Sequence, residues 1–322
     1  MIFSKAITNY YKKELLKRFD PDGSVFYFGK NDFPGLCMDE FSFVGDKGQK
    51  LVGGFYYRGE RRYDRVIVFD HGMGCGHAAY TTEVNLLTEK GFTVFTYDHT
   101  GTLNSEGEHI GGFSQSLSDL DHAMNALKAI PELKDTRFSV IGHSWGGFST
   151  MNIATLHPEI THVVALAGFI SPKAIQKQFL RGLLSPYRKD VFKLEEEILP
   201  NYCNFDARES LKKTDAKALI IHSKDDAVVS FKSHFEALRR EFSESDRVEF
   251  LVLDNKGHHP HYTQDANAYE EEFSTEYKLR KKSNLLSTQE EKDTFRNSFD
   301  WAKMTEQDMD VWNKILDFLN DK

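Results

Sequence analysis

The chain has 322 residues, of which 40% are hydrophobic and 28% charged, and its formal net charge is −8. This composition is that of an ordinary globular protein, long enough for one large α/β domain or two small ones. The acidic balance argues against nucleic-acid binding, because a protein that neutralises phosphates needs a basic face.

The cysteines and the apolar runs bear on the compartment. Cys37, Cys75 and Cys203 are few and odd in number, so they imply no disulfide framework, and no Cys-x-x-Cys pair suggests zinc. The N-terminus lacks the apolar core and cleavage site of a signal peptide. No apolar run approaches the roughly 18 residues needed to span a bilayer. We therefore expect a cytoplasmic protein without stable membrane insertion.

The N-terminal segment has helical periodicity. Apolar residues recur at every fourth position, as on one side of a helix: Phe3, Ile7, Tyr11, Leu15 and Phe19. The lysines of this segment would also suit a membrane surface. We expect residues 1–39 to form a helical extension that docks onto its own domain.

Strand-like and helix-like segments alternate from residue 40 onward. Two strands joined by a turn are expected over 40–58, and buried strands at 65–70, 92–97, 137–143, 162–167, 217–222 and 248–253. Helical spacing follows at 80–87, at 117–127, after Gly146, at 231–242 and at 309–319. This alternation predicts an α/β fold with a mainly parallel central sheet covered by helices on both faces.

Two segments interrupt the alternation, at residues 172–215 and 259–305. Unstructured loops of this length are uncommon in compact domains. We therefore expect both insertions to contain helices.

The stretch RFSVIGHSWGGFSTMNIA, residues 137–154, places Ser144 between Gly142 and Gly146 at the exit of a buried strand. The arrangement suits a nucleophile on a sharp strand-to-helix turn. Glycine and serine are also common turn residues, and a Gly-x-Ser-x-Gly occurs by chance in roughly one chain in ten of this length. The pentapeptide therefore needs support from elsewhere in the sequence.

That support comes from the ends of the other strands, because ligands of an open α/β sheet bind beyond the carboxyl ends of its strands. Reactive residues follow these ends in chain order: His71, Asp98 and His99, Ser144, Asp225 and Asp226, and His258. A nucleophile, an acid and a base thus fall on one rim in the order Ser, Asp, His. Alpha/beta-hydrolases use this order.

Four stretches carry a family resemblance: DHGMG (70–74), YDHTG with SEG (97–101, 105–107), GHSWGG (142–147), and HSKDDAVVS with GHH (222–230, 257–259). With them the chain resembles the alpha/beta-hydrolase superfamily, in the serine hydrolase branch that includes monoacylglycerol lipases and serine aminopeptidase-like proteins. It departs from the family in the shorter glycine-rich turn at 100–104 and in Ser223, where glycine is usual.

The resemblance implies a division of the chain. Residues 40–171 and 216–322 would form the alpha/beta-hydrolase core, and residues 172–215 a helical cap (lid) over the nucleophile. Apolar residues of this cap could line an acyl pocket or simply form the buried side of its helices: Phe179, Leu183, Leu184, Tyr187 and Phe192. The cap would then select the substrate without supplying catalytic groups.

The resemblance also assigns catalytic roles. Ser144 would be the nucleophile, activated by His258 as the base, with a carboxylate behind the histidine. The family pattern places the acid four residues after the strand-end histidine, which favours Asp226 over Asp225. The Gly-His pair favours His258 over two nearby histidines, His259 and His261.

The oxyanion donors would be the backbone N–H groups of Met73 and Trp145. A metal site is the competing interpretation of the histidines on this rim. No His-Glu-x-x-His or comparable ligand spacing is present, so we expect neither a metal nor another cofactor.

Together these observations predict a serine hydrolase that cleaves a small-molecule carboxylic ester through an acyl-serine intermediate. A thioesterase or a peptidase acting on small acyl or aminoacyl substrates would use the same residues. A non-catalytic family member that binds a small ligand is a further alternative. The acyl chain, the leaving group and the oligomeric state stay open.

Overall fold

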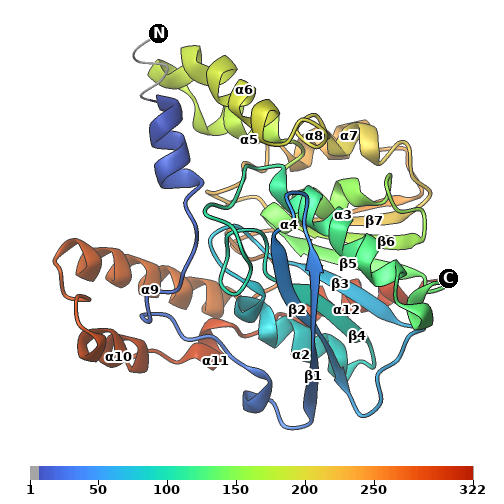
Figure 1. Ribbon diagram of the computed structural model, residues 1–322, viewed down its shortest axis with the longest axis horizontal. Helices are drawn as coiled ribbons and strands as arrows, with labels where there is room; N and C mark the ends of the chain where they lie inside the picture. The colour runs from blue at the N-terminus through green and yellow to red at the C-terminus, as the bar shows by residue number, and fades with distance from the viewer. Residues whose placement is uncertain (1–6, 322) are drawn as a thin grey trace.

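An eight-stranded sheet organises residues 7–321, which the computed structural model describes apart from the side chains of Glu14 and Leu15. The sheet lies at the centre of the molecule (Figure 1). Its strands are β1 (Leu36–Val44), β2 (Lys50–Arg58), β3 (Val66–Asp70), β4 (Thr93–Tyr97), β5 (Phe138–His143), β6 (Ile160–Leu166), β7 (Lys217–Ser223) and β8 (Val248–Leu253).

The strand order is β1-β2-β4-β3-β5-β6-β7-β8. β1 pairs antiparallel with β2, and β2 antiparallel with β4, whereas all the remaining pairs are parallel. This confirms the predicted mainly parallel sheet. The parallel strands end at one edge, so the residues that follow β3, β5, β7 and β8 meet there.

Helices cover both faces of the sheet. Val66 and Val68 of β3 pack into one core, and Ile67 and Phe69 pack into the other, as expected for a strand buried on both sides. The first core includes α3 (Gln115–Lys128), α4 (Trp145–Ile153) and α8 (Phe235–Glu241), and the second includes α2 (Thr81–Glu89) and α12 (Met309–Asn320).

Both insertions contain helices, as expected. Residues 172–215 form α5 (Pro172–Phe179), the 3-10 segment η5 (Gly182–Tyr187), α6 (Arg188–Ile198) and α7 (Ala207–Ser210). Residues 259–305 form α9 (Gln264–Lys282), α10 (Gln289–Asn297) and α11 (Trp301–Met304). The two groups lie well apart at the periphery, α5 and α6 at the top and α9 to α11 at the lower left of Figure 1. Further short turns are η2 (Lys30–Asp32), η3 (His77–Tyr80) and η4 (Pro131–Leu133).

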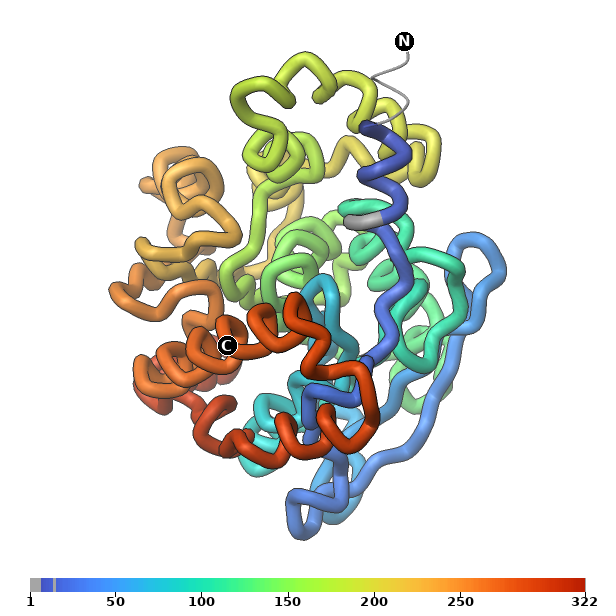
Figure 2. Tube along the Cα trace, turned by 90° about the vertical axis from the view of Figure 1, so that its left-hand side faces the viewer, coloured from blue at the N-terminus to red at the C-terminus, as the bar shows by residue number. Residues whose placement is uncertain are grey.

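The N-terminal segment docks onto the domain as expected, with Tyr11 5% and Leu16 2% exposed. Its helical part is shorter than predicted, because the π-helical turn η1 (Tyr11–Leu15) is followed by extended chain. Phe19 forms a bridge with Thr102, and the predicted boundary at residue 40 falls inside β1. Phe3 lies outside the described residues. Figure 2 shows the segment passing from the 172–215 insertion toward α9–α11.

Helix α8 begins at Phe235, so Phe231 precedes it instead of lying on it as predicted. The backbone before α8 is held by side chains: Asp226 accepts hydrogen bonds from the N–H groups of Val228 and Val229, and Gln178 bonds to residues 228 and 230. These bonds hold residues 228–230, and the N–H groups of Ser233 and His234 then turn back to the carbonyl of Ser230 just before the helix.

Within the described residues, no helix combines the length and the apolar character required to cross a membrane.

Candidate active site

Ser144 occupies a strained turn between β5 and α4. Its backbone has φ 55° and ψ −106°, in the left-handed region that residues with a side chain rarely adopt. A Cβ on Gly142 would lie 2.2 Å from the carbonyl oxygen of Gly146, and one on Gly146 would lie 2.1 Å from that of Asp70. Both glycines are therefore required by close backbone approach.

The structure brings three of the predicted residues into one hydrogen-bonded series. Ser144 Oγ lies 2.9 Å from His258 Nε2, and His258 Nδ1 lies 2.9 Å from Asp226 Oδ2. The carboxylate accepts from the Nδ1–H, which leaves the Nε2 lone pair to accept from the serine hydroxyl. This is the direction in which a proton would leave Ser144.

The Asp226 carboxylate is buried and has more donors than the sequence indicated. Its Oδ1 accepts from the N–H groups of Val228 and Val229, at 2.8 and 2.9 Å, and its Oδ2 lies 3.0 Å from His222 Nε2. Burial raises the pKa of Asp226, but the hydrogen bonds from His222 and His258 outweigh it and hold the pKa well below its usual range. The residue therefore stays ionised at neutral pH.

The rival residues point elsewhere. Asp225 accepts from the hydroxyl of Ser223 and from the backbone N–H of Gly257, so it fixes the turn that carries His258. His259 stacks on the ring of Tyr262, and His261 Nε2 lies 3.0 Å from Glu83 Oε1. These contacts give all three rivals structural partners.

The peptide group between Gly72 and Met73 is anchored on the Gly72 side. The Gly72 N–H donates to the hydroxyl of Tyr80 at 3.1 Å, and the Gly72 carbonyl accepts from His71 Nδ1 at 2.7 Å and from the Cys75 thiol at 3.1 Å. A carbonyl held on one side directs the N–H of the same peptide, which belongs to Met73, to the opposite side.

Trp145, the second predicted donor, is the first residue of α4, so its N–H has no acceptor within the helix. Its indole ring is fully buried, and the indole Nε1 donates to the carbonyl of Phe113 at 2.7 Å. The carbonyl of Trp145 accepts from the hydroxyl of Ser116 at 3.2 Å, so both its backbone and its side chain are held.

His143 connects Tyr80, which bonds to Gly72, with the backbone of His258. Its Nδ1 lies 2.8 Å from the hydroxyl of Tyr80 and its Nε2 lies 2.8 Å from the carbonyl of His258. Burial, with the neighbouring histidines, lowers the pKa of His143 well below its usual value. The neutral ring donates from Nε2 and accepts at Nδ1, a role that its place in the GHSWGG motif did not reveal.

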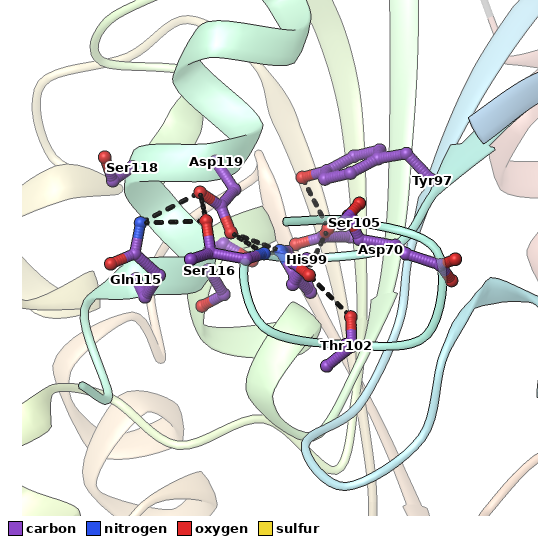
Figure 3. Close-up of polar contacts among 12 residues, drawn as sticks. Asp70, Tyr97, His99, Thr102, Ser105, Gln115, Ser116, Ser118 and Asp119 are labelled. Carbon is purple, nitrogen blue, oxygen red and sulfur yellow. Dashed lines mark hydrogen bonds and ion pairs between the residues drawn. The ribbon is translucent and has the colours of Figure 1, made fainter. Parts of the chain in front are cut away.

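A buried polar network lies beneath the turn, and Figure 3 shows His99 between Asp70 and Asp119. His99 Nε2 is 3.0 Å from Asp70 Oδ1 and His99 Nδ1 is 3.2 Å from Asp119 Oδ2. Burial lowers the pKa of His99, but the two carboxylates outweigh it and raise the pKa to about 9. Asp70 also accepts from Ser149 of α4 and from Tyr97. His99, placed on the rim by the sequence, is thus a core residue.

The five apolar residues singled out from the sequence of the 172–215 insertion are at most partly buried, whereas others of the insertion, such as Ile175 and Val191, lie in the core. Leu183 is 95% exposed, and Phe179 and Leu184 are each nearly half exposed. The Phe179 ring stacks on that of Phe113, with the centroids 6.1 Å apart. Within residues 7–321, no group of three His, Cys, Asp or Glu side chains is arranged to hold a metal ion.

Comparison with known sequences gives matches that cover part of the chain. Residues 61–204 match the family described as serine aminopeptidase S33, a range that includes Ser144 and ends before Asp226 and His258. A putative carbamate hydrolase, RutD of Klebsiella pneumoniae, is 27% identical over 135 residues, which are 42% of this chain and 44% of that protein. The chain thus matches less than half the length of this curated relative.

Comparison with solved structures extends over most of the chain. An esterase of Pyrococcus furiosus superposes with a TM-score of 0.58 at 17% identity, covering 83% of this chain and 98% of the esterase. Acetyl xylan esterase 1 of Thermoanaerobacterium superposes with a TM-score of 0.53 at 19% identity, covering 76% of this chain and 82% of that protein. At such identities the likeness is one of fold.

Proposed function

Because the chain belongs to the alpha/beta-hydrolase superfamily, we propose that it is a serine hydrolase that cleaves carboxylic esters through an acyl-serine intermediate. The predicted fold is that of the solved relatives. The observation that carries the proposal is the hydrogen-bonded series from Ser144 through His258 to Asp226, at 2.9 Å for each step.

In the first half of the reaction, Ser144 Oγ attacks the carbonyl carbon of the ester while His258 Nε2 takes the hydroxyl proton. The carbonyl oxygen becomes an oxyanion that accepts hydrogen bonds from the N–H groups of Met73 and Trp145. When the intermediate collapses, the bond to the alkoxy group breaks. His258 returns the proton to the departing alcohol, leaving an acyl-serine.

In the second half, water attacks the acyl carbon and His258 takes its proton. The tetrahedral intermediate expels Ser144 Oγ, which recovers the proton, and the carboxylic acid leaves. Asp226 stabilises the imidazolium formed in each half, and its low pKa keeps it ionised throughout. The cycle restores every protein group and uses no cofactor.

A carbamate is the second candidate substrate, favoured by the likeness to putative carbamate hydrolases. The same residues would form a carbamoyl-serine in place of an acyl-serine. Thioesters and small peptides require the same attack on a carbonyl, so the leaving group decides among these substrates.

We also propose that residues 172–215 form a cap over the site. Two contacts support this: Phe179 of α5 stacks on Phe113, and the carbonyl of Phe113 accepts the indole N–H of Trp145. One residue, Phe113, therefore links the insertion to Trp145, by a ring contact on one side and a hydrogen bond from the indole on the other.

A substrate screen tests the proposal. Purified protein is assayed against p-nitrophenyl esters of graded chain length, the corresponding thioesters and a p-nitrophenyl carbamate, with Ser144→Ala as the blank. The proposal predicts ester turnover that disappears in the variant. Turnover of the carbamate alone would select the second candidate, and an equal rate in the blank would refute both.

A further inference from the structure

We propose that the 172–215 insertion holds the catalytic loops in position through two of its side chains, Gln178 of α5 and Glu195 of α6. The inference deepens the proposed hydrolase function and rests on it. Neither residue contacts the triad, so both are positioning residues. The insertion then does more than select the substrate, which was all that the sequence led us to expect.

Gln178 holds the loop that follows Asp226. Its Nε2 donates to the carbonyl of Val228 at 2.8 Å, and its Oε1 accepts from the N–H of Ser230 at 2.9 Å. The same Oε1 lies 3.1 Å from His234 Nε2. One amide from the insertion therefore meets three polar groups of the segment between β7 and α8.

The direction of these hydrogen bonds is fixed by His234. Its Nδ1 accepts from the N–H of Ile170 at 3.3 Å, so its Nε2 carries the hydrogen and donates to Gln178. Burial, with the nearby His222, lowers the pKa of His234 to about 4, which keeps the ring neutral. The orientation of the Gln178 amide is thus set by its surroundings.

The loop that Gln178 holds is the one that holds the catalytic acid. The N–H groups of Val228 and Val229 donate to Asp226 Oδ1, while the Val228 carbonyl accepts from Gln178. Val228 is therefore bonded on one side to the carboxylate and on the other to the insertion. A shift of the loop would move Asp226 against His258, and the orientation of the imidazole depends on that contact.

Glu195 holds the opposite side of the site. Its carboxylate accepts from the N–H of Ser114 at 2.7 Å, from the hydroxyl of the same serine, and from Gln176 Nε2 at 3.2 Å. Glu195 is 1% exposed, and a Cβ on Gly112 would lie 2.5 Å from its Oε1. The loop of residues 111–114 is thus packed directly against the carboxylate.

This loop in turn supports an oxyanion donor. Phe113, the neighbour of Ser114, accepts the indole N–H of Trp145, whose backbone N–H is one of the two proposed donors. Burial raises the pKa of Glu195, so the site has to compensate the charge with donors. These donors are Ser114 of the core loop and Gln176 of α5. The bonds from Ser114 connect the loop to the insertion.

The test uses alanine at both positions with matched controls from the same helices. Gln178→Ala is compared with Lys177→Ala, and Glu195→Ala with Glu196→Ala, since both control residues are exposed. Glu195→Gln keeps an oxygen that can accept from Ser114. Thermal unfolding shows which variants are folded. If Glu195→Ala does not fold, the inference is tested with Glu195→Gln and Gln178→Ala alone.

With a short p-nitrophenyl ester, each alanine variant should lower kcat by about tenfold or more with KM changed less than about twofold, because substrate contacts are kept. Glu195→Gln should recover most of kcat. Gln178→Ala should also move the acidic limb of the kcat/KM pH profile to lower pH, because a displaced Asp226 stabilises the protonated imidazole less. The controls should match wild type.

Hydrogen exchange gives a readout that does not need activity. Amides 228–230 should exchange faster in Gln178→Ala, and amide 114 faster in Glu195→Ala. Folded variants with wild-type exchange and kcat would overturn the inference. A wild-type protein without hydrolase activity would instead overturn the proposed function, while the exchange rates still decide whether the insertion anchors these loops.

Discussion

Replacing Asp226 by asparagine exchanges one carboxylate oxygen for an NH2 group, at a side chain whose two oxygens are both hydrogen-bonded. The N–H groups of Val228 and Val229 both require an acceptor, at 2.8 and 2.9 Å from Asp226 Oδ1. The asparagine oxygen will occupy that position, because the amide nitrogen would oppose two donors there. The amide nitrogen then replaces Oδ2, 2.9 Å from His258 Nδ1.

An NH2 group at this point donates to Nδ1 and forces the hydrogen of His258 onto Nε2, which faces Ser144. The base can then no longer accept the serine proton. The same tautomer error in the Ser-His-Asp protease template costs about 10⁴ in kcat, or about 5.5 kcal/mol of transition-state stabilisation. We expect Asp226→Asn to lose activity on that scale while remaining folded.

The assay is steady-state hydrolysis of a p-nitrophenyl ester, with the melting transition measured for each variant. Asp225→Asn is the control, since Asp225 bonds to Ser223 and to the 256–257 backbone and does not contact His258. It should keep kcat within about tenfold of wild type. Equal losses in the two variants, or a larger loss at Asp225, would refute the reasoning.

Two further predictions concern the turn and the network beneath it. Gly146→Ala should destabilise the protein by several kcal/mol and abolish activity, because the added Cβ would lie 2.1 Å from the backbone of Asp70. Gly29→Ala is the control, since the nearest atom to its Cβ would be 3.8 Å away, and chemical denaturation should find it nearly as stable as wild type. The raised pKa of His99, about 9, predicts stability that is fully present below pH ~6.5 and is lost as the pH rises through about 9. Denaturation midpoints between pH 6 and 10 should fall in wild type, and His99→Asn should flatten this dependence.

Local pattern was enough to predict most of the fold. The buried runs at 65–70 and 217–222 are β3 and β7 with almost the predicted bounds, because an apolar run flanked by turn residues has few other solutions. The start of α8 was predicted at Phe231 because apolar spacing continues through it. The side chains of Asp226 and Gln178, which hold the preceding residues 228–230, lie outside the segment 231–242, so its apolar pattern could not show them.

The residues of the candidate site likewise divide into those that the sequence could predict and those that it could not. Ser144, Asp226 and His258 follow strand ends, and a parallel sheet brings such residues together, so motif and topology predict their meeting. His99 also follows a strand end, but its contacts with Asp70 and Asp119 turn it into the core. Gln178 bonds to residues 228–230 and Glu195 bonds to Ser114, and each pair is 50 or more positions apart in the sequence. No short sequence motif can indicate contacts between residues so far apart.

The most direct test of the account is covalent labelling of Ser144 by a fluorophosphonate. The phosphorus should be attacked by Ser144 Oγ only if His258, 2.9 Å away, accepts the hydroxyl proton. Intact mass and peptide mapping should find one adduct per wild-type chain, on Ser144, and none in a folded Ser144→Ala variant. A wild-type protein that stays unlabelled, or an adduct that persists in the variant, would contradict the assignment of Ser144 as the nucleophile.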